Sequence, residues 1–242
     1  RIVQCPMGIF GVAMASAVLP TLSGLAQKKD LVSLKKTLVF SLENIFFVMC
    51  PMTVILILLS EPIIRIFFQR GEFGAYSTTI TSSALSYYAI GLLSFGGIKI
   101  LVTAFYALQD TKTPVKVAAL CLGINAVLNF ILMFPLKVGG IALASAIAGT
   151  IDFLILLHFM DRRLEGINTG LWRYFVKVFG ASVLSGAAVF WMWRDFVFVP
   201  EIVRLISAAM TGMLLYGSLC LAFKIDQARK IWEWIKKGGQ EA

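Results

Sequence analysis

Charged residues are scarce in this sequence. Of its 242 residues, 14% are charged and 59% are hydrophobic, and the mean hydropathy is +0.85. Soluble globular domains have about a quarter of their residues charged, so this composition excludes a soluble fold. We expect an integral membrane protein.

The apolar runs also lack the alternation of apolar and polar residues that a membrane β-barrel shows. They last about 20 residues or more, as membrane-spanning helices do, whereas barrel strands need roughly 10 residues. The sequence therefore predicts an all-α fold, a polytopic transmembrane helix bundle of about seven spans. The expected spans lie at about 4–25, 38–60, 80–108, 115–135, 138–160, 171–193 and 200–223, and a short amphipathic tail follows at about 226–237.

Catalytic and metal-binding signatures are missing as well. The sequence contains no HExxH, no GxSxG and no Walker loop, the motifs by which many hydrolases and nucleotide-binding enzymes are identified. The four cysteines stand singly in apolar segments, without the CxxC or Cys/His spacing that metal and redox sites use. We therefore expect neither an enzyme nor a resident cofactor.

The start of the chain lacks a signal-peptide pattern. The first residue is Arg rather than Met, and no basic, then apolar, then small-residue segment precedes the first span. The chain is expected to be a fragment of a longer protein whose N-terminal part is missing.

Basic residues are distributed unevenly between the two ends of the spans. If the first span runs from outside to inside, fifteen Lys and Arg lie at inner ends and six at outer ends, with Lys99 left inside a span. The positive-inside rule then places the C-terminal tail in the cytoplasm. The net charge of +9 is explained by topology and by attraction to anionic membrane lipids. No basic stripe interleaved with aromatics indicates a nucleic-acid partner.

Two spans carry patterns that predict their shape or packing. The first contains Pro6, Gly8, Gly11 and Pro20, so a straight, uninterrupted helix is not expected; the break either lines a cavity or affects shape alone. The fifth has small residues at four-residue spacing, which let helix backbones approach closely and predict a packing face. These small residues are Gly140, Ala144 and Ala148.

Lys99 lies in the middle of the third span, where a charged side chain is energetically costly to place in hydrocarbon. A charge at that depth is expected to face a protein interior or a water-filled cavity. One interpretation is a structural ion pair with Asp152 or Glu43. The other is a cavity that holds a phosphate-bearing substrate, for which Lys supplies a point charge.

Asn125 and Asn129 are four residues apart in the fourth span, which places both side chains on one face of the helix. Such amides hold a neighbouring helix, or they coordinate a hard cation together with carbonyls and a hydroxyl such as that of Ser145. Both interpretations remain open at this point.

Two stretches resemble the MurJ (MviN) family of lipid II flippases. The first is RIVQCPMGIFGVA from Arg1, continuing to VLPTLS at residues 18–23, and it is similar to the eighth transmembrane helix of the family. The second is Ile90–Val115, with Lys99, FYA at 105–107, QD at 109–110 and KTPV at 112–115. It is similar to the tenth helix and the loop that follows. The resemblance covers the chain to about residue 163.

The resemblance implies the second half of a fourteen-helix flippase of the multidrug/oligosaccharidyl-lipid/polysaccharide exporter superfamily. Residues 1–163 would be the second-lobe bundle of five spans, and 164–225 two additional helices that form a lipid-tail groove in the family. Residues 226–242 would be a cytoplasmic, amphipathic, basic tail. The implied partners are membrane lipids, the missing N-terminal lobe and lipid II, the undecaprenyl-pyrophosphate-linked peptidoglycan precursor. The family moves this lipid from the inner to the outer leaflet of the bacterial cytoplasmic (inner) membrane by alternating access.

The resemblance also implies site residues. Arg1 falls on the cavity arginine of the family, which implies a pyrophosphate ligand, and Lys99 is a second candidate for substrate binding. Some members have a sodium site, and Asn125, Asn129, Ser145 and the carbonyl of Ile141 match its positions in two helices. Asn129 stands where an acid can occur in the family. Sodium or the membrane potential is the implied driving force, and no other metal site is expected.

Two other functions stay open on the sequence. One is an exporter of the same superfamily that carries a different polyprenyl-linked glycan or a drug. The other is a membrane scaffold of a cell-wall assembly complex that transports nothing.

Overall fold

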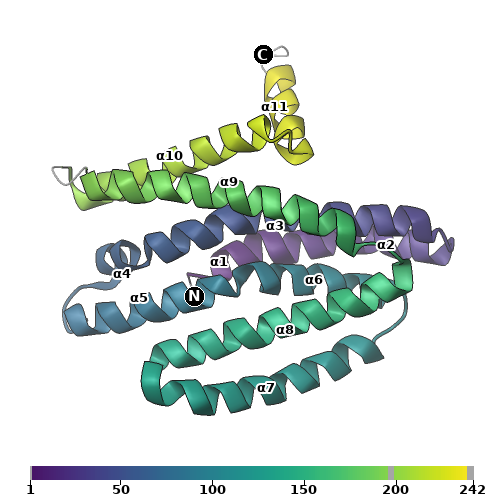
Figure 1. Cartoon of the computed structure of the whole chain (residues 1–242), viewed down its shortest axis with the longest axis horizontal. Helices are drawn as coiled ribbons and strands as arrows, with labels where there is room; N and C mark the ends of the chain where they lie inside the picture. The colour runs from purple at the N-terminus through teal and green to yellow at the C-terminus, as the bar shows by residue number, and fades with distance from the viewer. Residues whose placement is uncertain (1, 196–198, 239–242) are drawn as a thin grey trace.

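The computed structural model describes residues 2–195 and 199–238, and Figure 1 shows them as a bundle of helices. No strand occurs within these two ranges, so the all-α prediction is confirmed. Six helices are long and apolar enough to cross a membrane, or seven if the bent pair α5–α6 is counted as one span. The elements are α1 Gln4–Pro6, the π-helix η1 Met7–Val12, α2 Ala13–Gln27, α3 Leu31–Leu58, α4 Ser60–Phe68, α5 Ala75–Ile90, α6 Leu92–Ala107, α7 Lys112–Leu136, α8 Val138–Leu164, α9 Asn168–Asp195, α10 Glu201–Ala222 and α11 Asp226–Gly238.

The long helices lie side by side in an order that differs from their order in the chain (Figure 1). α7 lies at one edge and packs on α8, which in turn packs on α5 and α6. α6 packs on α3 and α2, α3 packs on α9, and α10 closes the opposite edge against α9. The helices α3, α6 and α8 therefore form the interior of the bundle.

The buried core is centred on α3 and α6. Leu34, Leu38, Leu42 and Ile45 of α3 are at most 1% exposed, and their spacing of four, four and three residues places them on one helical face. Ile100 of α6 is equally buried. In a lipid environment such helices associate through close packing rather than through removal of apolar surface from water.

The first span is continuous from Gln4 to Gln27, but it is not α-helical throughout. Its segment Met7–Val12 is a π-helix, a rare geometry that often marks functional positions. Gly11 is the buried residue of this segment, and a Cβ added there would lie 4.0 Å from the Cα of Gly96 in α6. The span is therefore uninterrupted, contrary to the expected break, and its irregularity is a change of helical pitch at Met7–Val12.

The third span is bent, which the sequence did not predict. In place of one helix at about 80–108, α5 and α6 meet at Gly91 with an angle of 42° between them. A Cβ added to Gly91 would lie 2.8 Å from the Cα of Ala146 in α8. The glycine therefore lets the backbone of α8 touch the bend, and this contact is invisible in the sequence of either helix.

The small residues of α8 form the packing face that the sequence predicts. Gly140, Ala144 and Ala148 are buried, and Ala142 and Ala146 between them are buried too. Two faces of α8 are covered because α7 lies on one side and the α5–α6 pair on the other.

The last helix, α11, runs crosswise to the spans beyond the end of α10 (Figure 1). Its first turn is held against α3, where the Nε2 of Gln227 donates a hydrogen bond to the Oε2 of Glu43 at 3.0 Å. The ammonium of Lys230 lies 4.5 Å from the ring centroid of Phe40. The sequence predicts that an amphipathic segment begins here, and the helix starts at Asp226.

Candidate functional site

The start of the first span borders a cavity, but Arg1 itself lies outside the described residues, so its predicted role stays a prediction. The cavity has a volume of about 490 Å³ and lies between the chain start, α4 and α5. Ile2 and Gln4 line it from one side and Phe68 and Tyr88 from the other.

Lys99 belongs to an exposed stripe that runs along α6. Its side chain is exposed, as is that of Tyr106, and Phe95, Ile98 and Val102 of the same stripe are half-buried. These positions are three or four residues apart, so they share one helical face. Lys99 is therefore on the open side of the bundle, where a second part of the protein or a water-filled cavity would face it.

The structural ion pair considered for Lys99 does not form. Within residues 2–195 and 199–238, no carboxylate lies within salt-bridge distance of its ammonium. Glu43 instead accepts the hydrogen bond from Gln227, and Asp152 has a buried oxygen, Oδ1, without a hydrogen-bond partner. Lys99 thus remains available for a ligand.

The four residues predicted for a sodium site are brought together between α7 and α8. The Nδ2 of Asn129 donates to the Oδ1 of Asn125 at 2.6 Å, and the Nδ2 of Asn125 lies 3.4 Å from the Oγ of Ser145. Ser145 in turn donates to the carbonyl of Ile141 at 3.0 Å. The chain of hydrogen bonds therefore connects the two helices.

This cluster fits both interpretations of the asparagine pair. The contact between Asn125 and Ser145 bridges two helices, as interhelical amides do in membranes. The Oδ1 of Asn129 is buried and accepts no hydrogen bond, so it leaves one neutral oxygen free for a ligand. A cation that used the Oδ1 of Asn125 as well would replace the hydrogen bond that Asn129 now donates to it.

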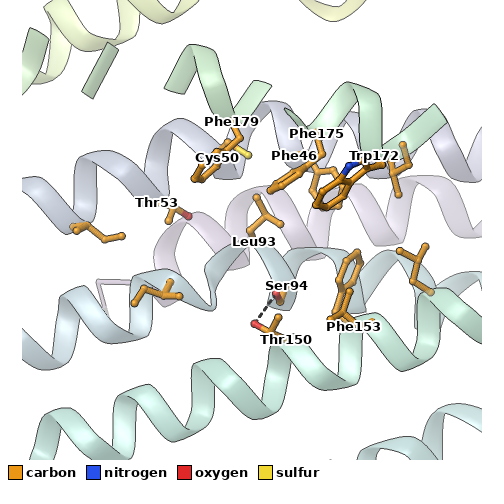
Figure 2. Close-up of a pocket in the computed structure, with 15 residues that line it drawn as sticks. Phe46, Cys50, Thr53, Leu93, Ser94, Thr150, Phe153, Trp172, Phe175 and Phe179 are labelled. Carbon is orange, nitrogen blue, oxygen red and sulfur yellow. Dashed lines mark hydrogen bonds between the residues drawn. The ribbon is translucent and has the colours of Figure 1, made fainter. Parts of the chain in front are cut away.

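A second cavity, of similar volume and mostly apolar, lies elsewhere in the bundle (Figure 2). Its volume is about 480 Å³, and its walls come from four regions: α3, the α5–α6 bend, α8 and the first half of α9. No described residue of α10 lines it. The lining residues are Phe46, Cys50, Thr53, Ile57, Ile90, Leu93, Ser94, Thr150, Phe153, Leu154, Leu157, Leu171, Trp172, Phe175 and Phe179.

Aromatic rings dominate one end of this cavity. Phe46 of α3 packs edge-on against Phe153 of α8 and Phe175 of α9, with ring centroids 5.9 and 5.7 Å apart, and Figure 2 shows these rings around the cavity. The polar atoms at the opposite wall are few. Ser94 and Thr150 share a hydrogen bond of 3.1 Å between α6 and α8. The cavity thus suits a flexible hydrocarbon chain better than a charged group.

A lipid-tail groove was expected at the last two spans. The observed cavity is lined by α9, the first of these two spans, together with α3, the α5–α6 bend and α8. The pattern that points to it is present in the sequence. Trp172, Phe175 and Phe179 are spaced three and four residues apart, so they form an aromatic stripe on one face of α9. The helices that this stripe faces became known only from the tertiary structure.

Comparison with known proteins identifies the family. Residues 1–209 match the sequence model of the family described as "Lipid II flippase MurJ". The chain belongs to the MurJ family. A probable lipid II flippase MurJ of Rhizobium tropici is 37% identical over 163 residues, covering 67% of this chain and 31% of the relative. The lipid II flippase MurJ of Burkholderia cenocepacia is 30% identical over 199 residues, covering 81% of this chain and 38% of the relative.

A solved MurJ structure has the same arrangement of helices. This structure, described as lipid II flippase MurJ in an inward closed conformation, matches with a TM-score of 0.79 and 30% sequence identity. The match covers 94% of this chain and 46% of the solved chain. The present chain therefore spans less than half the length of the MurJ proteins it matches, and it forms a multi-pass membrane bundle.

The MurJ-like motif at residues 105–115 has a structural role at the α6–α7 turn. The carboxylate of Asp110 accepts hydrogen bonds from the backbone N–H of Thr113 at 3.1 Å and from its Oγ1 at 2.8 Å. Arg163, at the end of α8, pairs with the same carboxylate at 3.0 Å. The hydrogen bonds from Thr113, aided by the charge of Arg163, lower the pKa of Asp110. This aspartate thus caps the start of α7 and ties it to α8.

Proposed function

We propose that this chain is part of a lipid II flippase, which moves the undecaprenyl-pyrophosphate-linked peptidoglycan precursor across the bacterial inner membrane by alternating access. The observation that carries the proposal is the match of residues 1–209 to the MurJ family. It is a transport function, without a catalytic residue. The rest of the protein would supply the second wall of the transport cavity.

The proposed role of the basic residues is to bind the pyrophosphate. Moving a charged headgroup across about 30 Å of hydrocarbon requires protein charges to replace its hydration. Lys99 supports this role because its ammonium lies on the open face of α6 without a carboxylate partner among the described residues. Arg1 is proposed as the second ligand, because the guanidinium group of an arginine donates two parallel hydrogen bonds to phosphate oxygens.

The proposed site for the polyprenyl tail is the apolar cavity beside α9. Its volume of about 480 Å³ and its aromatic wall suit part of a long, unsaturated hydrocarbon chain, and most of a bound tail would extend into lipid. This placement uses the first of the two additional helices, α9, as one wall.

The proposed orientation places α11 and the C-terminus in the cytoplasm. Support comes from the excess of Lys and Arg at the ends of the spans near α11. Sodium bound by Asn125, Asn129, Ser145 and the Ile141 carbonyl, or the membrane potential, is proposed as the driving force. The free Oδ1 of Asn129 supports a cation there.

A complementation experiment with the full-length protein tests the proposal. Arg1→Ala is expected to abolish rescue of a flippase-depleted strain at normal expression, and Lys99→Ala to weaken it, because each removes a charge from the headgroup site. Normal growth with Arg1→Ala would rule out the role given to Arg1. If both variants are silent while partner capture depends on surface residues, the scaffold alternative is correct.

A second experiment separates lipid II from other cargo. In proteoliposomes that contain the full-length protein, unlabelled lipid II is expected to compete with labelled lipid II for flipping. Competition by a drug or by another polyprenyl-linked glycan, but not by lipid II, would instead identify a different exporter of the superfamily.

A further inference from the structure

Asp152 is an intramembrane carboxylate to which the proposed transport mechanism assigns no role. It lies near the middle of α8, which runs from Val138 to Leu164. Its Oδ1 is buried and has no hydrogen-bond partner, and no Lys or Arg of the described ranges forms a salt bridge with it. An unpaired carboxylate at membrane depth is costly and commonly marks a functional position.

Asp152 borders a cavity of about 270 Å³ that α8 shares with α5, α6 and α7. Besides Asp152, the cavity is bordered by apolar or small side chains and by a few polar groups at its other end. The residues that complete the lining are Tyr88, Phe95, Ile98, Ala118, Cys121, Leu122, Asn125, Ser145, Ala148 and Gly149.

Two titratable groups from the neighbouring helices line this cavity, and a third, Lys99, directly follows a lining residue of α6. Cys121 comes from α7 and Tyr88 from α5. Lys99 lies on the α6 stripe whose members Phe95 and Ile98 line the cavity. The fourth neighbour, α3, meets this part of α8 through apolar contacts with the residue after Asp152.

Phe153, the residue after Asp152, shows which part of α6 lies beside this part of α8. A Cβ added to Gly97 of α6 would lie 2.4 Å from the Phe153 ring, so α8 and α6 touch closely at this point. Lys99 is two residues beyond Gly97. Asp152 and Lys99 therefore lie on contacting segments of two helices that border one cavity, and they form no salt bridge.

Asp152 is separate from the asparagine cluster. Ser145 lies seven residues earlier on α8, which corresponds to about 10 Å along a helix. Hard cations bind oxygen ligands at roughly 2 to 2.6 Å, so an ion held by Asn125 and Ser145 does not reach Asp152. Around Asp152 the lining offers a thiol and hydrocarbon rather than further ligand oxygens. A proton is the cation that needs only one carboxylate oxygen.

We propose that Asp152 is a proton-binding site of the protein. The carboxylate takes up one proton to become a neutral carboxylic acid when the cavity is shielded from water, and it releases that proton when the cavity is hydrated. Because Lys99 directly follows Ile98, which lines the same cavity on α6, the charge of Asp152 changes the field at the proposed headgroup ligand. The coupling to transport rests on the proposed flippase function, but proton binding itself does not.

Infrared spectroscopy of the full-length protein in lipid nanodiscs tests proton binding directly. The wild type is expected to show the C=O stretching band of a protonated carboxylic acid, shifted in D2O and absent from Asp152→Asn. Asp161→Asn, on the same helix near its C-terminal end, is the matched control and is expected to keep the band. A spectrum of Asp152→Asn identical to that of the wild type would overturn the proposal. Asp152→Glu, which restores a carboxyl group, is expected to restore the band at a shifted position.

Flipping in proteoliposomes tests the coupling. At a fixed membrane potential, the wild type and Asp161→Asn are expected to flip lipid II at a rate that changes with the pH difference across the membrane, and Asp152→Asn at a rate that does not. A wild-type rate independent of the pH difference would overturn the coupling. If the wild type does not flip lipid II at all, the flippase proposal fails, and the infrared band still decides proton binding.

Discussion

Replacing Gly91 by alanine tests whether the bend between α5 and α6 depends on close contact with α8. The added Cβ would lie 2.8 Å from the Cα of Ala146 and 2.8 Å from the ring of Phe95. The ring can turn away, but the Cα belongs to the backbone of a packed helix. Relief therefore requires α8 or the bend itself to shift.

The expected magnitude follows from two opposing effects. Overpacking a close contact costs about 1–3 kcal/mol. Alanine is better than glycine in a helix by about 1 kcal/mol, and Gly91 has an ordinary helical φ of −79°, so this gain applies in part. The Gly91→Ala variant is expected to lose about 1–2 kcal/mol of unfolding free energy.

The assay is a detergent-titrated unfolding of the full-length protein, with Gly180→Ala in α9 as the matched control. A Cβ at Gly180 meets no atom within 4 Å, so this variant is expected to be as stable as the wild type or slightly more so. Equal stability of Gly91→Ala and Gly180→Ala would refute the reasoning. So would full recovery of Gly91→Ala by an added Phe95→Ala, because the backbone contact would then have no cost.

Three further predictions concern the α6–α7 turn, the asparagine cluster and the apolar cavity. The hydrogen bonds that Asp110 accepts lower the pKa of its carboxyl group. The contribution of the ionised Asp110 to stability is therefore complete above the ordinary carboxyl pKa of ~4, and it is lost as the pH falls through the lowered pKa of the folded protein. The stability difference between the wild type and Asp110→Asn, measured by unfolding at a series of pH values, is therefore expected to shrink on acidification; a constant difference would contradict this. Asn125→Ala removes the bridge from α7 to Ser145 and is expected to cost about 0.5–1 kcal/mol, whereas an unchanged unfolding free energy would show that the bridge is not stabilising. Phe175→Ala opens the aromatic wall of the cavity and is expected to weaken the competition of a short polyprenyl phosphate with lipid II in the flipping assay. Trp191→Ala, which lies outside the cavity lining, is expected to leave this competition unchanged. Equal effects of the two variants would exclude the cavity as the tail site.

The sequence alone was sufficient for the fold class and for most span positions. The predicted spans at about 115–135 and 138–160 correspond to α7, Lys112–Leu136, and α8, Val138–Leu164. This works because the length of an apolar run is a local property that the bilayer thickness imposes. The family was also identified from local motifs, which the match over residues 1–209 confirms.

The candidate sites were only partly predictable. The cluster of Asn125, Asn129 and Ser145 was expected from spacing within two adjacent spans, and the structure joins its members by hydrogen bonds. The roles of Arg1 and Lys99 stay predictions, because a binding role depends on the opposite wall of a cavity. The free oxygen of Asp152 was not foreseen, since a sequence does not show which partners a side chain lacks.

By itself, the sequence determined that the chain is a helical membrane bundle of the MurJ family. Only the tertiary structure decided that the third span bends at Gly91 and that the apolar cavity is completed by α3, α6 and α8. It also decided that Asp152 borders a cavity beside the α6 segment that carries Lys99, without pairing with Lys99. The physical reason is the range of the interactions. Span length and charge placement depend on the residues of one segment and the surrounding lipid, whereas a bend, a cavity and an unpaired charge depend on which distant segments pack together.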